Sequence, residues 1–306
     1  MQLIVNLFYT LVGIVFLLLS KVKVRLRGYY TPKPFGSDEW ERCANYDISV
    51  VDNWLRHLAV YTHGELESVA KKSICELGPG SDLGTGLYLL SKQAAQYVAV
   101  DVNDMVTNAP DELYDALFSL IASRNDSDIH VLRSELRHLQ DGAGQRLRFM
   151  CSPSFDLAAS VEARSIDLVF SQAAFEHFDE IGRFVRDLDS VVKPGAILIA
   201  EVDLRTHSRW IRDKDELNIY RYSDRVYKLL RCSGSPNRIR PYQYREAFER
   251  CGWTNVRTKP LTVLNRERFS AVRHSLAKQF RGDHNQMEQL TIMLLATKGT
   301  AVASLE

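Results

Sequence analysis

The stretch that decides the fold is SICELGPGSDLGTG at 73–86, followed by YVAVDV at 97–102. Ser73–Leu77 is a short, mostly apolar run with an acid near its end, which is typical of a buried parallel strand. Gly78 and Gly80 then form a tight turn where the backbone can approach a ligand closely, because glycine has no Cβ. A helix is expected over 86–96, and its first turn offers unpaired N–H groups to that ligand. The run at 97–102 predicts a second strand.

The spacing of the glycines distinguishes two kinds of ligand. A dinucleotide site has the pattern G-x-G-x-x-G, and its third glycine would fall at position 83, which is Leu83. Glu76 precedes the turn, where a pyrophosphate would meet a negative charge, so a ligand with a cationic end fits better. S-adenosylmethionine (SAM) has an ammonium and a sulfonium and no phosphate. Asp101 stands where a nucleotide-binding βαβ unit places the carboxylate that binds ribose hydroxyls. An ordinary glycine-rich turn is the alternative.

Strand and helix patterns alternate through the rest of the core. This alternation predicts a doubly wound α/β sheet whose ligand binds at the carboxyl ends of the strands. Helices are expected over 110–124, on to about 140, over 178–191 and over 241–251, where Gly252 follows as a cap. Further strands are expected at 147–151, 166–171, 196–202, 253–263 and 290–297.

Three motifs together resemble a known family. E-L-G-P-G-x-x-L-G-T-G begins at Glu76, S-Q-A-A-F-E-H-F spans 171–178, and K-P-G-A spans 193–196. The chain resembles the class I SAM-dependent methyltransferases, in the small-molecule, type 11-like branch. The resemblance covers 73–203 well and the last two strands weakly. It implies a Rossmann-like sheet of seven strands with the last strand antiparallel, and SAM as methyl donor.

The resemblance also implies the residues of the donor site. Glu76, Gly78 and Gly80 match the first motif, and Asp101 matches the ribose-binding acid. The strand end that lines the methionine portion of the donor carries Ser171 and Gln172. Many members have an acid beside the adenine just after the third strand, but here the acid comes late, so Asp156, or Ser152 with backbone groups, would serve.

Methyl transfer to a hydroxyl requires alignment of donor and acceptor and removal of a proton. Three residues near the predicted strand ends are candidates for the base, namely His177, Glu176 and His207. The alternative for Glu176 and His177 is a structural helix start, and for His207 a surface loop. The five cysteines are scattered singly, without a zinc pattern or disulfide framework, so no metal is expected and a reducing compartment fits.

The first twenty residues contain no charge, and Lys21, Lys23, Arg25 and Arg27 follow at once. The run is long enough to cross a bilayer as a transmembrane helix. Its positive charges follow the apolar run rather than precede it, which argues against a signal peptide and leaves the bulk of the chain in the cytoplasm. A hydrophobic helix docked on the protein itself or on a partner is the alternative.

The expected organisation has five parts. These are a membrane-anchor helix at 1–20, a basic linker and helical cap at 21–72, a SAM-binding core at 73–203, a substrate-side insertion or lid at 204–250, and closing strands with a tail at 251–306. The insertion is rich in arginine and tyrosine, which suits either nucleic-acid stacking or a solvated lid with tyrosines packed inward. Arg205, Arg209 and Arg212 would suit an anionic substrate group. The net charge of +1 gives no general attraction to nucleic acid, so none is expected.

The predicted function is therefore methyl transfer from SAM to a small molecule, lipid or lipid-linked saccharide by a membrane-associated enzyme with a cytoplasmic catalytic domain. Two alternatives stay open. One is aminopropyl transfer at a SAM site, against which the arginine-rich insertion argues. The other is a non-catalytic scaffold, against which the intact donor motif argues.

Overall fold

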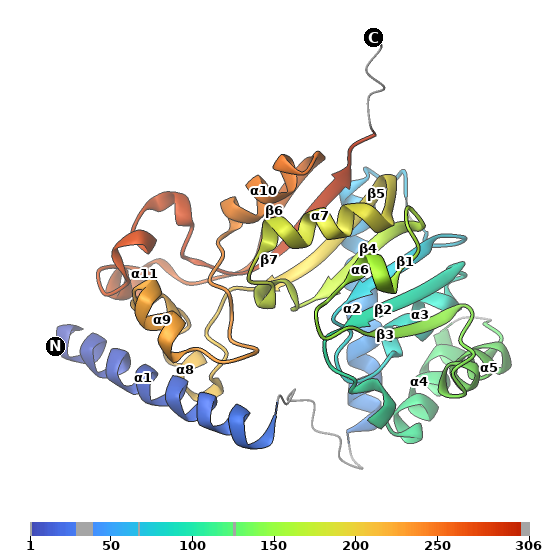
Figure 1. Ribbon diagram of the computed structural model, residues 1–306, viewed down its shortest axis with the longest axis horizontal. Helices are drawn as coiled ribbons and strands as arrows, with labels where there is room; N and C mark the ends of the chain where they lie inside the picture. The colour runs from blue at the N-terminus through green and yellow to red at the C-terminus, as the bar shows by residue number, and fades with distance from the viewer. Residues whose placement is uncertain (1, 29–38, 67, 125–126, 301–306) are drawn as a thin grey trace, which may run out of the picture.

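A seven-stranded sheet forms the centre of the protein, whose computed structural model describes residues 2–28, 39–66, 68–124 and 127–300 (Figure 1). The strand order is β3-β2-β1-β4-β5-β7-β6. The first five strands are parallel, and β7 is antiparallel to both of its neighbours, which confirms the predicted architecture. The strands are β1 (Ser73–Leu77), β2 (Gln96–Asp101), β3 (Leu147–Cys151), β4 (Ile166–Gln172), β5 (Val192–Asp203), β6 (Trp253–Val263) and β7 (Gln289–Lys298).

The strand order reverses at β1, which pairs with β2 on one side and with β4 on the other. In a doubly wound sheet the loops that follow the strands diverge at this point and leave a crevice for a ligand. The loops after β1, β2, β4 and β5 therefore meet at one edge of the sheet.

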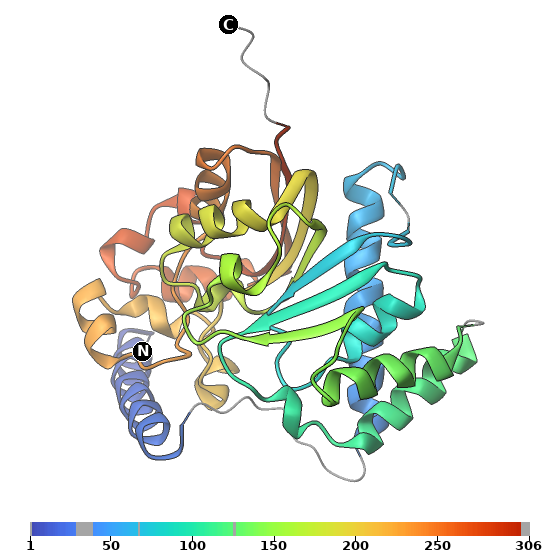
Figure 2. The ribbon, with the colours of Figure 1, turned by 45° about the vertical axis from the view of Figure 1, so that its right-hand side comes forward.

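Helices cover both faces of the sheet (Figures 1 and 2). Alternate residues of β1 point to opposite faces, so Ile74 joins one buried cluster and Cys75 the other. On the first face Trp54 stacks on Phe170 with ring centroids 5.0 Å apart, and both side chains are fully buried. That face carries α2 (Trp40–Tyr61), α3 (Gly84–Ser91), α4 (Asp111–Arg124) and α5 (Ile129–Gln140); the other carries α6 (Leu157–Ser160), α7 (Ile181–Val191) and α10 (Pro241–Arg250).

A third buried cluster lies beyond the sheet, where α1 packs beside segments from the second half of the chain (Figure 1). We call α1 together with residues 204–240 and 264–288 the α1 subdomain. Leu17 of α1 joins Leu217, Tyr220 and Leu264 in its core. Its elements are α1 (Gln2–Arg27), α8 (Arg209–Arg212), η3 (Asn218–Arg221), α9 (Asp224–Leu230), α11 (Arg266–Arg273), η4 (Lys278–Phe280) and η5 (Asp283–Asn285).

Several boundaries differ from the sequence-based expectations. Helix α1 continues to Arg27, so Lys21 belongs to a helix rather than to a linker; positions 29–36 of the expected linker lie outside the described residues. Helix α3 ends at Ser91, because Gln93 adopts a left-handed φ of 65° that stops the helix. Strand β5 begins at Val192, and the expected turn lies within it, where Gly195 has a φ of 79°.

Helix α10 belongs to the core rather than to the insertion expected at 204–250. Its Tyr244 and Phe248 are fully buried in the same cluster as the second face of the sheet. Gly252 follows this helix with a φ of 77°, as the sequence predicts for a capping glycine.

Candidate active site

The glycine turn after β1 touches the segment that follows β4. Gly78 has a φ of 72°, and a Cβ built on it would lie 2.6 Å from the Cβ of Ala174. Only glycine permits this close approach. The turn is therefore joined directly to η2 (Phe175–His177), which carries two of the candidate bases.

Gly80 has the opposite surroundings. Its φ is 82°, and a Cβ built on it would have no heavy atom within 4 Å. The turn thus leaves open space in front of Gly80, next to the carboxyl end of β2. A side chain here would fill space rather than displace protein atoms.

Asp101 lies at the end of β2 and faces this turn, as predicted. Its Oδ2 accepts from the Gly80 N–H at 3.4 Å, and its Oδ1 accepts from the Asn103 N–H at 3.0 Å. Burial raises the pKa of the Asp101 carboxyl, although these backbone hydrogen bonds lower it in part. The carboxylate is held in one orientation at the sheet edge.

Glu76 is held more deeply than the sequence suggests. Its Oε2 accepts from the hydroxyls of Tyr97 at 2.5 Å and Thr85 at 2.6 Å, and the residue is only 1% exposed. One carboxylate oxygen is therefore engaged inside the fold. That oxygen ties β1 to β2 and to the start of α3.

The remaining predicted donor-site residues have mixed positions. Ser171 is fully buried and donates to the Leu77 carbonyl at 2.9 Å, so its hydroxyl joins the ends of β1 and β4. Gln172 forms a hydrogen bond with Glu201, and its Oε1 is buried without a partner among the described residues. Ser152 Oγ accepts from the Asp156 N–H at 2.8 Å.

Asp156 itself is exposed and caps α6 by accepting from the Ala159 N–H at 3.0 Å. This capping contact gives its carboxylate a structural role at the start of the helix. The contact with adenine expected for Asp156 stays a prediction.

The candidate bases meet although His177 and His207 lie thirty positions apart in the sequence. Their rings lie 5.1 Å apart, edge to face. His207 Nε2 lies 3.8 Å from Glu176 Oε1 and 4.0 Å from Asp203 Oδ2. The loops after β4 and β5 thus bring all three candidates into one cluster.

The charges in this cluster follow from burial. Burial, followed by the charge of His177, lowers the pKa of His207 to about 4. Burial also lowers the pKa of His177, while a hydrogen bond to the Ser235 carbonyl opposes this. Both rings are therefore neutral at pH 7. Burial and then the charge of Asp203 raise the pKa of Glu176 well above its usual range, which favours the protonated acid.

Asp203 is the residue of this cluster that sequence reasoning missed. Burial would raise the pKa of its carboxyl, but hydrogen bonds and charges from Arg205 and Arg212 outweigh burial and lower it. Both arginines bind Asp203, at 2.9 Å and 2.5 Å, so neither guanidinium stands alone to receive an anionic substrate. The sequence does contain a signal for Asp203, because this acid ends the apolar run AILIAEVD, at the strand end where a ligand is expected.

Glu176, His177 and His207 each offer a ligand atom within 4.8 Å of the others. Zinc bonds of about 2.0–2.2 Å would require these atoms to move closer together. His177 Nδ1 and His207 Nε2 are buried without a hydrogen-bond partner among the described residues.

The donor-side residues fit SAM by two observations. The open space at Gly80 lies beside a carboxylate, Asp101, that suits ribose hydroxyls. The unpartnered Oε1 of Gln172 offers a buried acceptor at the neighbouring strand end. Helix α2 adds Asp47, because a Cβ on Gly84 would lie 2.2 Å from its Oδ2, so this cap helix packs on the donor turn.

Residues 75–200 match the family model described as a methyltransferase domain. None of the curated proteins matches the chain.

Three solved structures illustrate the structural likeness. A candidate sarcosine dimethylglycine methyltransferase from Galdieria sulphuraria is 16% identical, with a TM-score of 0.46 over 82% of this chain and 86% of the other. A SAM-dependent methyltransferase from Mesorhizobium loti is 12% identical, with a TM-score of 0.42; the match covers 77% of this chain and 95% of the other. Phosphoethanolamine N-methyltransferase 2 from Haemonchus contortus, solved with S-adenosylhomocysteine, is 13% identical, with a TM-score of 0.44. The match covers 94% of this chain and 58% of the other.

Proposed function

We propose that this chain, a class I SAM-dependent methyltransferase, methylates a hydroxyl or amine of a membrane lipid or lipid-linked saccharide, with His177 as the base. SAM supplies a methyl group on a positively charged sulfur. The protein must then hold the acceptor in line and remove its proton. Gly78, Gly80 and Asp101 would hold the donor, and Gln172 would line its methionine portion.

His177 suits the role of base because one ring nitrogen is available. The ring bonds the Ser235 carbonyl, and Nδ1 has no partner among the described residues, so Nδ1 can accept a proton. The charge of Asp203 raises the pKa of both histidines and would stabilise the protonated ring. A positive charge on His177 lowers the pKa of His207, so the pair binds one proton more readily than two.

The position of α8 is the observation that supports an acceptor in the membrane. Arg212 of α8 binds Asp203, and Trp210 of the same helix stacks on Phe16 of α1 with centroids 5.4 Å apart. One short helix thus connects the histidine cluster to the long apolar helix α1. An acceptor held in a membrane beside α1 would lie close to the base.

Helix α1 supports membrane association through its composition. Gln2–Leu26 is long enough to cross a membrane, and an 18-residue window within it has a mean hydropathy of 2.4. Basic residues at its end would face the anionic cytoplasmic leaflet, and SAM is made in the cytosol. We therefore propose a catalytic domain on the cytoplasmic side.

The test is methylation with labelled SAM of a lipid extract and of an aqueous extract from the same cells. The expected product partitions with the lipid. His177→Asn should lose the label at least about 100-fold, within the range for general base catalysis, while binding SAM normally by calorimetry. Label found only in aqueous products would contradict the lipid acceptor, and full activity of His177→Asn would contradict the base.

A further inference from the structure

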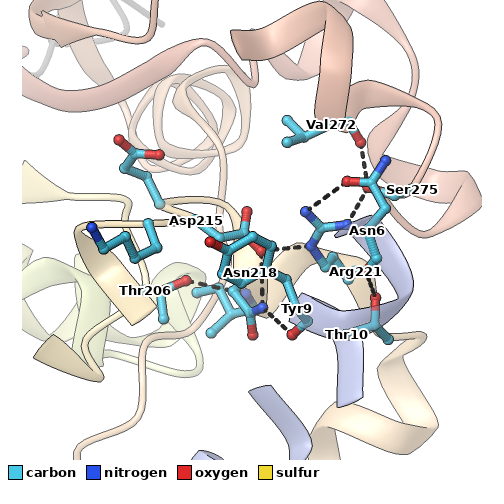
Figure 3. A network of polar contacts seen from close by, with 12 residues as sticks. Asn6, Tyr9, Thr10, Thr206, Asp215, Asn218, Arg221, Val272 and Ser275 are labelled. Atoms are coloured by element: carbon cyan, nitrogen blue, oxygen red, sulfur yellow. Dashed lines mark hydrogen bonds and ion pairs between the residues drawn. The ribbon is translucent and has the colours of Figure 1, made fainter. Parts of the chain in front are cut away.

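The face of α1 that packs on the protein combines polar contacts (Figure 3) with the apolar side chains of Ile14 and Leu17. Asn6 Nδ2 donates to the Ala271 carbonyl at 3.0 Å, and the Arg221 guanidinium donates to Asn6 Oδ1 at 3.3 Å. Arg221 is itself buried and paired with Asp215 at 2.6 Å. The N-terminal part of α1 is thus joined to a buried ion pair.

The middle of α1 is held by its backbone. Asn218 Nδ2 donates to the Tyr9 carbonyl at 2.8 Å, and the Tyr222 hydroxyl donates to the Thr10 carbonyl at 2.9 Å (Figure 3). Gly13 completes this contact, since a Cβ on it would lie 2.0 Å from Asn218 Oδ1. The absence of a side chain at Gly13 is therefore what lets the helix lie this close.

The opposite face of α1 is apolar and exposed. A continuous stripe at helical spacing has side chains that are 47–82% exposed, formed by Leu3, Leu7, Leu11, Val15, Leu18 and Val22. A helix on a water-soluble protein buries its apolar face and exposes its polar face. Helix α1 instead leaves this apolar stripe exposed and turns Asn6 and Thr10 inward together with Leu17, so its outer face suits surroundings other than water.

We propose that α1 lies in the plane of a membrane surface, docked on the protein along the face that carries Asn6, Gly13 and Leu17, with its apolar stripe in the lipid at the boundary of headgroups and acyl chains. This inference rests on the membrane association proposed above and replaces a spanning helix with an interfacial one. The occupant of the stripe is the bilayer itself.

The contacts along α1 argue against spanning. They extend from Asn6 to Lys21, whose Nζ donates to the Leu229 carbonyl at 2.7 Å. These residues are separated by about 22 Å of helix, at 1.5 Å per residue. A helix crossing the bilayer would either lose these contacts or carry the Arg221–Asp215 pair into hydrocarbon, where charged groups are costly.

The surroundings of the stripe favour lipid over a protein partner. Trp210 is half-exposed beside Phe16, and tryptophan is enriched at membrane surfaces. Exposed basic residues lie on the same two helices, with Arg25 on α1 and Arg225 and Lys228 on α9, which packs beside α1. Their charge complements anionic headgroups.

The first experiment measures binding of the full chain to vesicles of phosphatidylcholine with phosphatidylglycerol. Leu11→Lys and Leu18→Lys should each weaken partitioning by at least about tenfold, because each removes a leucine from lipid. Leu261→Lys, which changes an exposed leucine of β6, is the matched control and should have no effect. Failure of the wild type to bind would overturn the membrane association itself. Self-association or capture by another protein instead of vesicle binding would do the same.

The second experiment separates an interfacial helix from a spanning one. The substitutions Asn6→Cys and Ala271→Cys introduce two thiols that a short bismaleimide joins on vesicle-bound protein, which also carries Cys151→Ser, Cys232→Ser and Cys251→Ser. Cysteines at 7 and 271 are the control, because Leu7 points outward. The 6–271 pair should cross-link on vesicles and the 7–271 pair should not. Loss of the 6–271 cross-link on vesicles, with binding intact, would overturn the interfacial position alone.

Discussion

The two long helices at the N-terminal end, α1 and α2, turn opposite faces to the protein. Helix α2 buries an apolar face that includes Trp54 and Leu58, both with no exposed surface. Helix α1 is more apolar overall, yet only Gly13 and Leu17 of its residues are buried among those described. It contacts the fold through amides, a guanidinium and carbonyl groups, and through the apolar side chains of Phe16 and Leu17.

This difference shows that hydrophobicity alone does not decide what a helix is for. Helix α2 is held by removal of apolar surface from water, which stabilises the core by about 25 cal/mol per Å². Helix α1 is held by polar contacts together with the burial of Leu17. Helix α2 therefore belongs to the apolar core, whereas α1 leaves most of its apolar surface exposed.

The largest expected effect contrasts a glycine from each region. Gly80→Val should abolish SAM binding, because the side chain would fill the open space in front of the turn. Gly13→Val should leave SAM affinity unchanged and detach α1, because its Cβ would meet Asn218. Calorimetry with SAM and the 6–271 cross-link measure the two outcomes. Equal loss of SAM affinity in both variants would show that the donor site depends on the docking of α1.

The next effect concerns stability. Trp54→Ala should lower the free energy of unfolding by about 3–5 kcal/mol, because it leaves a cavity against Phe170. Leu11→Ala on the exposed face of α1 should change it by less than about 0.5 kcal/mol in detergent. Denaturant unfolding of both variants, followed by tryptophan fluorescence or circular dichroism, provides the measurement. A similar cost for both would mean that the outer face of α1 is packed in solution.

A smaller effect tests the donor site within the core. Asp101→Ala should weaken SAM binding by about 1.5–3 kcal/mol, the range for losing hydrogen bonds to a charged group. Asp104→Ala removes an exposed acid three residues away and serves as the control. Calorimetry should show the loss only for Asp101. Unchanged affinity would remove Asp101 from the donor site.

The pH dependence of activity probes the histidine pair between the two regions. A protonated histidine cannot accept a proton, so kcat/KM falls as the pH drops through the pKa of the base. Burial lowers the pKa of His177 and of His207, which places this acid limb below pH 6.5. Asp203→Asn should move it lower still, because the charge of Asp203 raises both values. A limb above pH 6.5 in the wild type would exclude this pair as the base.

The smallest expected effect is the change in SAM affinity when α1 is removed. A chain starting at Tyr29 should bind SAM with affinity within about twofold of the wild type, since the donor residues contact β1, β2 and β4 rather than α1. The same chain should no longer float with vesicles. Loss of SAM binding by a folded truncated chain would show that the α1 subdomain supports the donor site.

The sequence by itself determined the core strands, the glycine turn and the position of Asp101. These features follow from local patterns, because β1, the turn and β2 are consecutive and their periodicity is that of buried parallel strands. The sequence predicts His177 and His207 only as separate candidates at two strand ends, not as a pair in contact. Their meeting depends on the pairing of β4 with β5, which no local pattern specifies.

Only the tertiary structure decided which way α1 faces. The first twenty residues are uncharged, so composition indicates a membrane helix but cannot distinguish a spanning helix from a docked one. The decision rests on partners more than two hundred residues away, such as Arg221 for Asn6 and Asn218 for Tyr9. Asp203 likewise acquires its role from Arg212, and α10 joins the core through Tyr244 and Phe248. Long-range contacts of this kind depend on the packing of the whole chain, whereas strands and turns are specified by neighbours in sequence.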